Sequence, residues 1–538
     1  MISLGRVQPS TEPQPGQTQP GQTQAAQTQA AQTQATQPEP PRVQPAAPPL
    51  AVRPVLLLAG AVVAVLLATS GRYGYHRDEL YFIVAGQHPA WGYADQPPFT
   101  PLLLAAMNAI APGSLLVLRL PSALAAAATV LLCGLLAREM GGGRRAQLLA
   151  GSFAAVSAVT LVTGHFVTTT TFDVLFAALL CWLLARAIRT GDGRLLVPAG
   201  VVLGVGLLNK DLVGILAVAL LAGIAIAGPR WLLRSRWLPV GGLVAVVLGL
   251  PYVIWQARHG WPQVELARVI ADEGDEGGRI GFIPFQLILV SPLLTPVWMA
   301  GLIRLLRSPQ ALPFRGFAVM YLLLAAIFLV TGGKAYYMAG AYPVLLGSGA
   351  VAIDGWLSPG ATTLRRWLVA AAVGLSAASA AVVGLSLLPP SVLAGSLILE
   401  MNPDAGEMVG WPAEVNTIAQ VWNGLPTAER QHAVIFTANY GEAGAIERYG
   451  PERGLPAPYS GHNALADFSV PPGSSAPVLV IGYSDQGFLG QFFAGCTLAA
   501  RVDNGYGLDN EEQGHTIWVC RQVRRPWAQL WPELRHLS

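Results

Sequence analysis

Acidic residues that could do chemistry follow the first apolar stretch of the sequence. Asp78 and Glu79 come soon after that stretch, and Asp95 lies in Gly-Tyr-Ala-Asp-Gln-Pro-Pro, at a rigid Pro-Pro bend. Asp173 follows a run of threonines and Phe172. A solvated loop charge would explain each acid taken alone. Titratable groups that converge in one cleft are instead a common mark of a functional site.

The basic candidates are the only two lysines of the chain, Lys210 and Lys334. Pairing with the adjacent Asp211 would give Lys210 a structural role. Lys334 stands beside Tyr336 and Tyr337 in GGKAYYMAG. Aromatic residues are common anchors at a membrane interface, but a lysine beside two phenols also suits a lipid phosphate.

Metal and nucleotide signatures are absent from the sequence. His165, just before the threonine run, could be a metal ligand, although a hydrogen-bonding loop residue is the simpler interpretation. No spacing of His, Cys and carboxylates resembles a zinc site. There is no Walker loop, no GxGxxG and no GxSxG elbow. The sequence therefore requires no cofactor, leaves a divalent cation possible, and identifies no metal ligands.

The composition shows which elements must position these residues. The 538 residues are 53% hydrophobic and only 12% charged, whereas soluble domains carry about 25% charged residues. A net charge of +3 gives no reason to expect nucleic acid as a partner. The predicted membrane spans are 54–70, 115–137, 146–164, 172–186, 195–209, 211–228, 238–256, 282–303, 316–331, 339–354 and 367–388.

Arginine placement predicts the orientation of these spans. Every second connection is rich in arginine, and the intervening ones are not. The positive-inside rule places the arginine-rich connections in the cytoplasm. Residues 1–53 then lie inside, an odd number of spans places 389–538 outside, and Asp78, Asp95 and Asp173 share the outer face. The arginine-rich connections are 138–145, 186–194, 230–236, 304–315 and 365–366.

Three segments lie outside the spans. Residues 1–53 form a Gln/Thr/Pro-rich tail that we expect to be disordered, because it has few apolar side chains to bury. The first outer loop, 71–114, should form short amphipathic helices along the interface. A second outer loop, 257–281, is acidic and rich in glycine, and we expect it to be mobile.

The tail 389–538 mixes strand-like runs, such as AVIFTA and APVLVIGY, with helical ones. We predict a small extracytoplasmic α/β domain there. Cys496 and Cys520 lie on two of its strand-like runs, and a disulfide between them is plausible outside the cytoplasm, although the sequence does not settle it. Cys133 and Cys181 fall in apolar runs and should be inert. The predicted fold class is an all-α polytopic transmembrane bundle of about 11 spans with this domain appended.

These residues together resemble the GT-C membrane glycosyltransferases. The branch most similar is the protein O-mannosyltransferase-like family, which includes the aminoarabinose transferases of lipid A. The resemblance covers roughly 54–355, which makes 54–388 the expected GT-C catalytic domain. It rests on Asp78-Glu79, the bend Asp95-Gln96-Pro97-Pro98, the Thr-Phe-Asp entry to the fourth span, Lys334-Ala335-Tyr336-Tyr337 and Ala341-Tyr342-Pro343. The tail also resembles outer domains of bacterial members in Asn439-Tyr440-Gly441-Glu442-Ala443.

The resemblance implies a role for each catalytic candidate. Asp78 would be the general base that takes a proton from the acceptor hydroxyl, with Glu79 beside it, and Asp173 would hold the acceptor or the sugar. A base contributes roughly 10²–10⁴ in rate. Asp95 and His165 would serve the acceptor, the sugar or a cation.

The resemblance also implies a donor site. Lys334, Tyr336 and Tyr337 would bind the polyprenyl phosphate, a leaving group whose developing charge needs cations or hydrogen-bond donors. Lys210 and Gln96 would assist, although many relatives have His at the position of Gln96, and Gln cannot carry a charge. Direct displacement would invert the anomeric centre.

The predicted function is thus a mannosyltransferase-like hexosyl- or pentosyltransferase of the plasma (inner) membrane. It would use a polyprenyl-phosphate sugar and a protein or glycan acceptor. The alternative is a polytopic transporter or flippase, which would hold ionisable residues near the midplane. A scaffold that displays the tail domain is a third possibility. Glu442 and His462 could contact the acceptor, but a structural role suits them equally.

Overall fold

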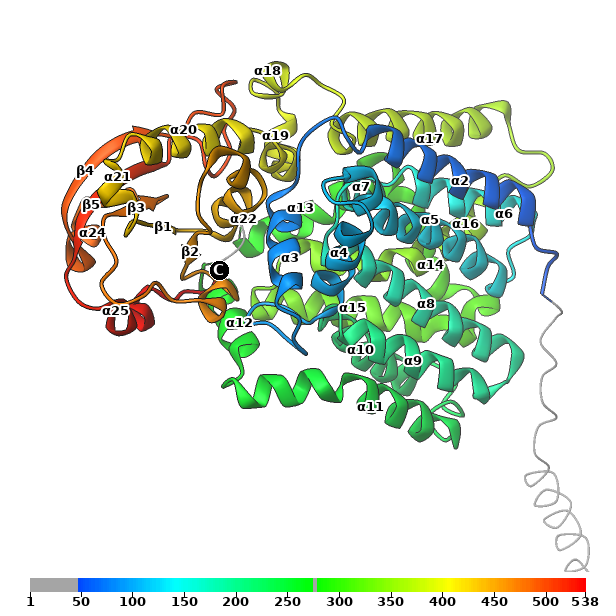
Figure 1. The fold of residues 1–538 in the computed structure, drawn as a ribbon. Helices are drawn as coiled ribbons and strands as arrows, with labels where there is room; N and C mark the ends of the chain where they lie inside the picture. Colours follow the sequence, from blue (N-terminus) through cyan, green and yellow to red (C-terminus); the bar gives the residue numbers. More distant parts are fainter. Residues whose placement is uncertain (1–46, 274–277) are drawn as a thin grey trace, which may run out of the picture. The chain divides into compact units, whose positions relative to one another are not determined.

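The computed structural model describes residues 47–273 and 278–538, and residues 47–538 form one compact unit. Most of the predicted tail 1–53, and part of the loop 257–281, lie outside the described residues. The predicted disorder of the tail and the predicted mobility of the loop are therefore untested. Figure 1 shows a body of helices with a small sheet at one end.

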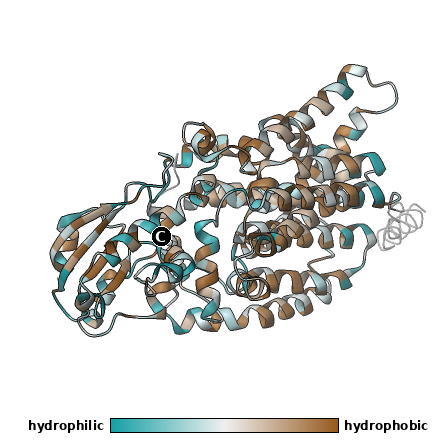
Figure 2. Cartoon of the chain, turned by 45° about the horizontal axis from the view of Figure 1, so that its top comes forward, coloured by the Kyte–Doolittle hydropathy of each residue, from teal (hydrophilic) through white to brown (hydrophobic). Residues whose placement is uncertain are grey.

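All the predicted spans are helical, and their bounds differ from the predicted ones by a few residues. The helices are α2 (Val52–Thr69), α5 (Leu115–Glu139), α6 (Arg144–Ala155), α7 (Ala158–His165), α8 (Thr169–Thr190), η1 (Gly193–Leu195), α9 (Leu196–Leu207), α10 (Leu212–Ala227), α11 (Trp237–Arg258), α13 (Gly278–Val290), η2 (Pro292–Leu294), α14 (Thr295–Arg307), η3 (Pro309–Phe314), α15 (Arg315–Thr331), η4 (Ala335–Ala341), α16 (Tyr342–Trp356) and α17 (Thr363–Gly384). Figure 2 shows hydrophobic residues along them.

The chain is a multi-pass membrane protein, but the predicted number of 11 spans is not confirmed. Within 47–273 and 278–538, seven helices are long and apolar enough to cross a membrane, or up to nine if each of two bent pairs is one span. The predicted spans 195–209 and 211–228 correspond to α9 and α10, which are shorter apolar helices.

Local sequence explains both bends. The pair α6–α7 bends by 54° where Ser157 caps the new helix, its Oγ accepting from the N–H of Thr160 at 3.4 Å. The pair formed by α13 and the segment from Pro292 bends by 85°. Proline has no N–H to continue a helix, and it disfavours helical geometry in the residue before it.

The connection 71–114, predicted to be the first outer loop, contains two short helices, α3 (Arg77–Gln87) and α4 (Phe99–Ile110). A capping box starts α3: His76 accepts from the backbone of α3, and the Glu79 side chain accepts from the N–H of His76 at 2.9 Å. This cap fixes the first turn of the helix, where Asp78 and Glu79 lie.

Two of the arginine-rich connections, 138–145 and 304–315, contact each other near the start of α2. Arg138 donates to the carbonyl of Pro48 at 2.9 Å, and Arg304 donates to the carbonyl of Met140 at 2.9 Å. In Figure 1 the start of α2 lies at the opposite end of the helices from the sheet. These arginines therefore lie at the end of the helices opposite the sheet.

The C-terminal region is the predicted small α/β fold. Its sheet has the order β2-β1-β3-β5-β4, in which β1 is parallel to β2 and β3, and β5 is antiparallel to β3 and β4. Its elements are α18 (Pro390–Leu393), α19 (Ile398–Met401), η5 (Pro403–Met408), α20 (Trp411–Asn423), α21 (Thr427–Arg430), β1 (Val434–Thr437), α22 (Tyr440–Tyr449), η6 (Pro451–Arg453), β2 (Tyr459–Ser460), α23 (Leu465–Phe468), β3 (Val478–Ile481), α24 (Gln486–Phe492), β4 (Phe493–Arg501), β5 (Thr516–Val523) and α25 (Trp527–Leu534).

Both faces of the sheet are buried at β1 and β3, since all four residues of each strand are buried and successive residues point to opposite sides. Phe436 packs with Trp527 and Trp531 of α25 on one face, while Ile435 and its neighbours on the other face join the large core that includes α20 and α22. Cys496 and Cys520 are opposite each other on β4 and β5 and form the disulfide that the sequence left open.

Candidate active site

A cavity of about 430 Å³ gathers most of the candidate residues. It lies between the connection 71–114, the connections before α10 and after α15, the helix α12 (Pro262–Glu273) and the C-terminal region. The predicted candidates that line it are Asp78, Asp95, Gln96, Lys210, Lys334, Tyr336 and Tyr337. The C-terminal region adds Tyr440, Asn463 and Ser538.

Asp78 lies in the first turn of α3, where the helix dipole favours a negative charge. Its N–H donates to Nδ1 of His76 at 3.1 Å. The phenol of Tyr440 donates to Oδ1 of Asp78 at 3.0 Å. Among the described residues this carboxylate has no other side-chain hydrogen-bond donor, so its second oxygen can accept from a substrate hydroxyl.

Asp95 is held by a tyrosine in the same way. The phenol of Tyr81 donates to Oδ1 of Asp95 at 2.5 Å. Burial raises the pKa of Asp95 to about 6, although the bond from Tyr81 opposes the shift. The rings of Tyr81 and Tyr440 lie 4.7 Å apart, so the two tyrosines and the two acids form one cluster at the wall of the cavity.

A second cluster carries the positive charge of the cavity. Nζ of Lys210 lies 5.2 Å from the ring centre of Tyr336 and 5.4 Å from that of Tyr337, and it donates to Oγ1 of Thr170 at 3.2 Å. Burial lowers the pKa of Lys210, and the nearby Asp173 opposes this shift. A cation above two phenol rings, with Lys334 in the same wall, is an arrangement that attracts an anionic group.

Lys210 does not pair with Asp211, which was the structural role considered for it. Tyr252 donates a hydrogen bond to Asp211 instead. Gln96 shows a further unused donor: its side chain is 5% exposed, and its Nε2 has no hydrogen-bond partner among the described residues. Because unpaired buried donors are costly, Gln96 is suited to bind a ligand in the cavity.

Glu79, which the sequence predicts as catalytic, lies outside the cavity and makes structural contacts. Its side chain is fully buried and accepts from Arg119, with Nε at 2.9 Å and Nη2 at 2.7 Å. It also accepts from the N–H groups of His76 and Val167 at 2.9 Å. Both oxygens are therefore occupied, and none is left for a substrate.

Asp173 and His165 do not line the cavity either. Asp173 is buried in α8 and is the carboxylate that most strongly favours the charged form of Lys210. His165 is buried and lies within hydrogen-bond distance of Ser386 (3.1 Å) and Thr69 (3.4 Å). Asp173 therefore acts on the cavity through Lys210, and His165 has the simpler structural role.

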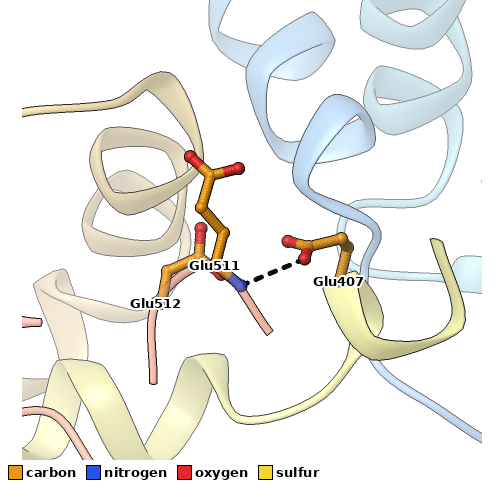
Figure 3. A group of neighbouring side chains, drawn as sticks. All are labelled: Glu407, Glu511 and Glu512. Carbon is orange, nitrogen blue, oxygen red and sulfur yellow. Dashed lines mark hydrogen bonds between the residues drawn. The ribbon is translucent and has the colours of Figure 1, made fainter. Parts of the chain in front are cut away.

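An acidic group beside α3 is the described cluster that comes nearest to a metal site. Carboxylate oxygens of Glu407, Glu511 and Glu512 lie within 4.8 Å of one another, and Figure 3 shows Glu407 accepting from the N–H of Glu511. Arg77 already forms ion pairs with all three, the closest with Glu511. A guanidinium therefore supplies the positive charge that a metal would otherwise bring.

Glu442 and His462 are structural. Glu442 is fully buried, accepts from the N–H of Asn439 at 3.2 Å and lies 2.8 Å from Nδ1 of His515. His462 accepts from the N–H of Tyr440 at 3.2 Å, and burial lowers its pKa to about 3. Neither lines the cavity, so the acceptor contacts considered for them are not supported.

Sequence reasoning missed the two tyrosines that hold the acids. Tyr81 follows Asp78 by three residues on a helix, and this spacing places two side chains on the same side, so Tyr81 could have been found. Tyr440 belongs to a motif that was noticed but given no role. No local signal indicates that it would meet a residue 362 positions earlier in the chain.

Comparison with known proteins confirms the resemblance to GT-C glycosyltransferases. Residues 95–255 match the model of the family described as dolichyl-phosphate-mannose-protein mannosyltransferase. No curated protein sequence matches the chain.

The fold is shared with a solved protein, ArnT. The crystal structure of ArnT from Cupriavidus metallidurans bound to undecaprenyl phosphate matches with a TM-score of 0.57 and 15% identity, over 87% of this chain and 97% of that one. The apo structure of the same protein gives the same values. The Archaeoglobus fulgidus oligosaccharyltransferase complexed with Zn and sulfate is similar at a TM-score of 0.46 and 15% identity, over 73% of this chain and 61% of that one.

Proposed function

We propose that this protein transfers a sugar from a polyprenyl-phosphate donor to an acceptor hydroxyl, with Asp78 as the general base. The observation that carries the proposal is the cavity itself, whose wall holds both a partly exposed carboxylate and a lysine–tyrosine cluster. Glycosyl transfer needs these two functions together, a base for the attacking hydroxyl and positive charge for the leaving phosphate.

Each part of the cavity has a task in this reaction. Lys210 and Lys334 would neutralise the phosphate, and Gln96 would donate a hydrogen bond to it or to the sugar. Asp78 would take the proton of the acceptor hydroxyl as that oxygen forms the new bond to the anomeric carbon and the phosphate leaves. Attack opposite to the leaving group inverts the anomeric centre.

Two further observations support the donor class and the side of the membrane. The structural relative ArnT was crystallised with undecaprenyl phosphate. The cavity belongs to the connections that alternate with the arginine-rich ones, and the disulfide between Cys496 and Cys520 suits an oxidising compartment. We therefore place the cavity and the C-terminal domain, residues 389–538, on the outer face of the plasma membrane.

A transporter is less well supported. Transport would need ionisable residues near the membrane midplane, whereas Asp78, Asp95, Lys210 and Lys334 lie in the first turn of a short helix or in connections between helices. A flux assay on reconstituted vesicles with the donor lipid would show movement without a glycosylated product if transport were the function.

The test is incubation of the purified protein with a panel of labelled polyprenyl-phosphate sugars, followed by identification of the labelled product. Asp78→Asn should lower transfer roughly 10²–10⁴-fold while the protein stays folded and inserted. Asp503→Asn, which alters an exposed carboxylate away from the cavity, is the matched control and should keep wild-type turnover. Near-normal turnover of Asp78→Asn would refute the assignment of the base.

A further inference from the structure

The segment Asn439–Gly444 makes the contact between α22 and α3. Asn439 caps α22 by accepting from the N–H of Glu442 at 2.9 Å, and Glu442 accepts in return from the N–H of Asn439. Because this capping box directly follows β1, it fixes where α22 begins. Tyr440 therefore lies in the first turn of the helix, at the end that faces α3.

Two glycines let the helices approach closely. A Cβ on Gly441 would lie 2.8 Å from the ring of Trp411 and 3.2 Å from Cβ of Arg77. A Cβ on Gly444 would lie 2.9 Å from the backbone carbon of Leu80. Larger residues would push α22 away from the helix that carries Asp78.

The ring of Tyr440 is enclosed on several sides. It lies 4.7 Å from the ring of Tyr81 and 4.8 Å from that of His462, and the guanidinium of Arg77 lies 4.8 Å from its centre. Its own N–H donates to His462. This packing fixes the direction of the phenol, which donates to Oδ1 of Asp78 at 3.0 Å.

We propose that Tyr440 is a positioning residue for Asp78 and that the C-terminal domain thereby completes the active site. Its phenol holds one carboxylate oxygen so that the other faces the acceptor hydroxyl. This inference rests on the proposed function, because it assigns a partner to the proposed base. Burial raises the pKa of Tyr440 well above 10, which keeps the phenol protonated and donating at neutral pH.

If Tyr440 were only structural, it would pack α22 onto α3 without affecting the protonation of Asp78. The pH dependence of transfer separates the two roles, because a donor to a carboxylate stabilises its charged form and lowers its pKa. The charged and titratable groups that face Asp78 from the elements around it are His76, Arg77, Asp95, Lys210 and Tyr440. Of these, Tyr440→Phe alters only the last.

The experiment measures kcat against pH for the wild type and for Tyr440→Phe. Loss of the phenol should raise the midpoint of the acid limb by roughly one pH unit and lower kcat at the optimum roughly tenfold, with the KM of the donor unchanged. The matched control is Tyr449→Phe, which removes a half-buried phenol from the far end of the same helix. It should leave both kcat and the acid limb unchanged.

A second variant keeps the test decisive if Tyr440→Phe does not fold. Replacing Tyr440 with 3,5-difluorotyrosine retains the ring and makes the phenol a stronger donor, so the acid limb should move to lower pH. If neither substitution moves the acid limb, the inference is overturned, even if kcat is reduced. The proposed function would still stand in that case, provided that Asp78→Asn is inactive. Absence of wild-type transfer, or an active Asp78→Asn, would instead refute the proposed function, and the inference with it.

Discussion

Asp78 and Glu79 are adjacent in the first turn of α3, yet their surroundings differ completely. Glu79 is fully buried, and Arg119 and two backbone N–H groups occupy its oxygens. Asp78 borders the cavity and accepts from one side chain, Tyr440. Adjacent helical side chains point roughly 100° apart, so one faces the core and the other the cavity. Unused hydrogen-bonding capacity therefore distinguishes the proposed base from the buried carboxylate beside it.

The largest expected effect comes from breaking the buried pair. Glu79→Gln should lower the free energy of unfolding by about 3–5 kcal/mol, because it leaves the guanidinium of Arg119 buried without a charged partner. Thermal unfolding in detergent measures this. Asp78→Asn is the comparison and should unfold near the wild-type temperature. Equal unfolding temperatures for the two variants would contradict the difference drawn between these acids.

The next largest effect concerns the positive cluster of the cavity. Lys210→Met removes a cation that faces Tyr336 and Tyr337. Since hydrogen bonds to charged groups contribute about 1.5–3 kcal/mol, the KM of the donor should rise roughly 10–100-fold, with little change in the KM of the acceptor. Initial-rate kinetics with both substrates varied measure this. Arg258→Met, which removes an exposed charge outside the cavity, should change neither KM. If Lys210→Met changed the KM of the acceptor more than that of the donor, Lys210 would contact the acceptor and not the donor.

Asp95 is intermediate between the two acids, since it is largely buried but lines the cavity. Its pKa is raised from 3.8 to about 6 in the folded protein, so the native state binds more protons than the unfolded state between these values. The free energy of unfolding therefore falls as the pH rises through this window. Asp95→Asn should gain stability relative to the wild type by about 1–3 kcal/mol between pH 4 and 7.

Thermal unfolding of both proteins across this pH range measures the gain. A difference between Asp95→Asn and the wild type that does not depend on pH would contradict the raised pKa of Asp95.

The smallest expected effect tests whether burial, rather than ion pairing itself, makes Glu79 structural. Glu533 and Arg525 form a two-bond pair at 2.6 and 2.8 Å, and both side chains are exposed. Exposed pairs contribute little because water already solvates both charges. Glu533→Gln should leave the unfolding temperature unchanged. A loss as large as that for Glu79→Gln would mean that pairing alone accounts for the difference.

Much of the fold could be predicted from periodicity and composition. Each apolar stretch became a helix, and the strand-like runs of the tail became β1, β3, β4 and β5, because burying apolar side chains drives both. The predicted number of 11 spans is not confirmed, and hydropathy does not show that Pro292 bends one stretch by 85°. It also does not show that α9 and α10 are short.

The candidate site was predicted in part. Asp78, Asp95 and Lys334 were identified by residue type and loop position, and the structure brings them to one cavity. The contacts of Glu79 could not be predicted, because sequence position alone does not show that Arg119 would reach it from α5. Tyr440 was missed for the same reason: its partner is distant in the chain, and only tertiary packing brings the two together.

The close contact of α22 with α3 also bears on the order of synthesis. A ribosome makes α3 early and α22 some 362 residues later, so the nascent chain carries the proposed base long before its tyrosine partner exists. Until the last part of the polypeptide has been translated and folded, one wall of the cavity is missing. A chain that stalls during translation after α17 would carry Asp78 but lack Tyr440 and the rest of that wall.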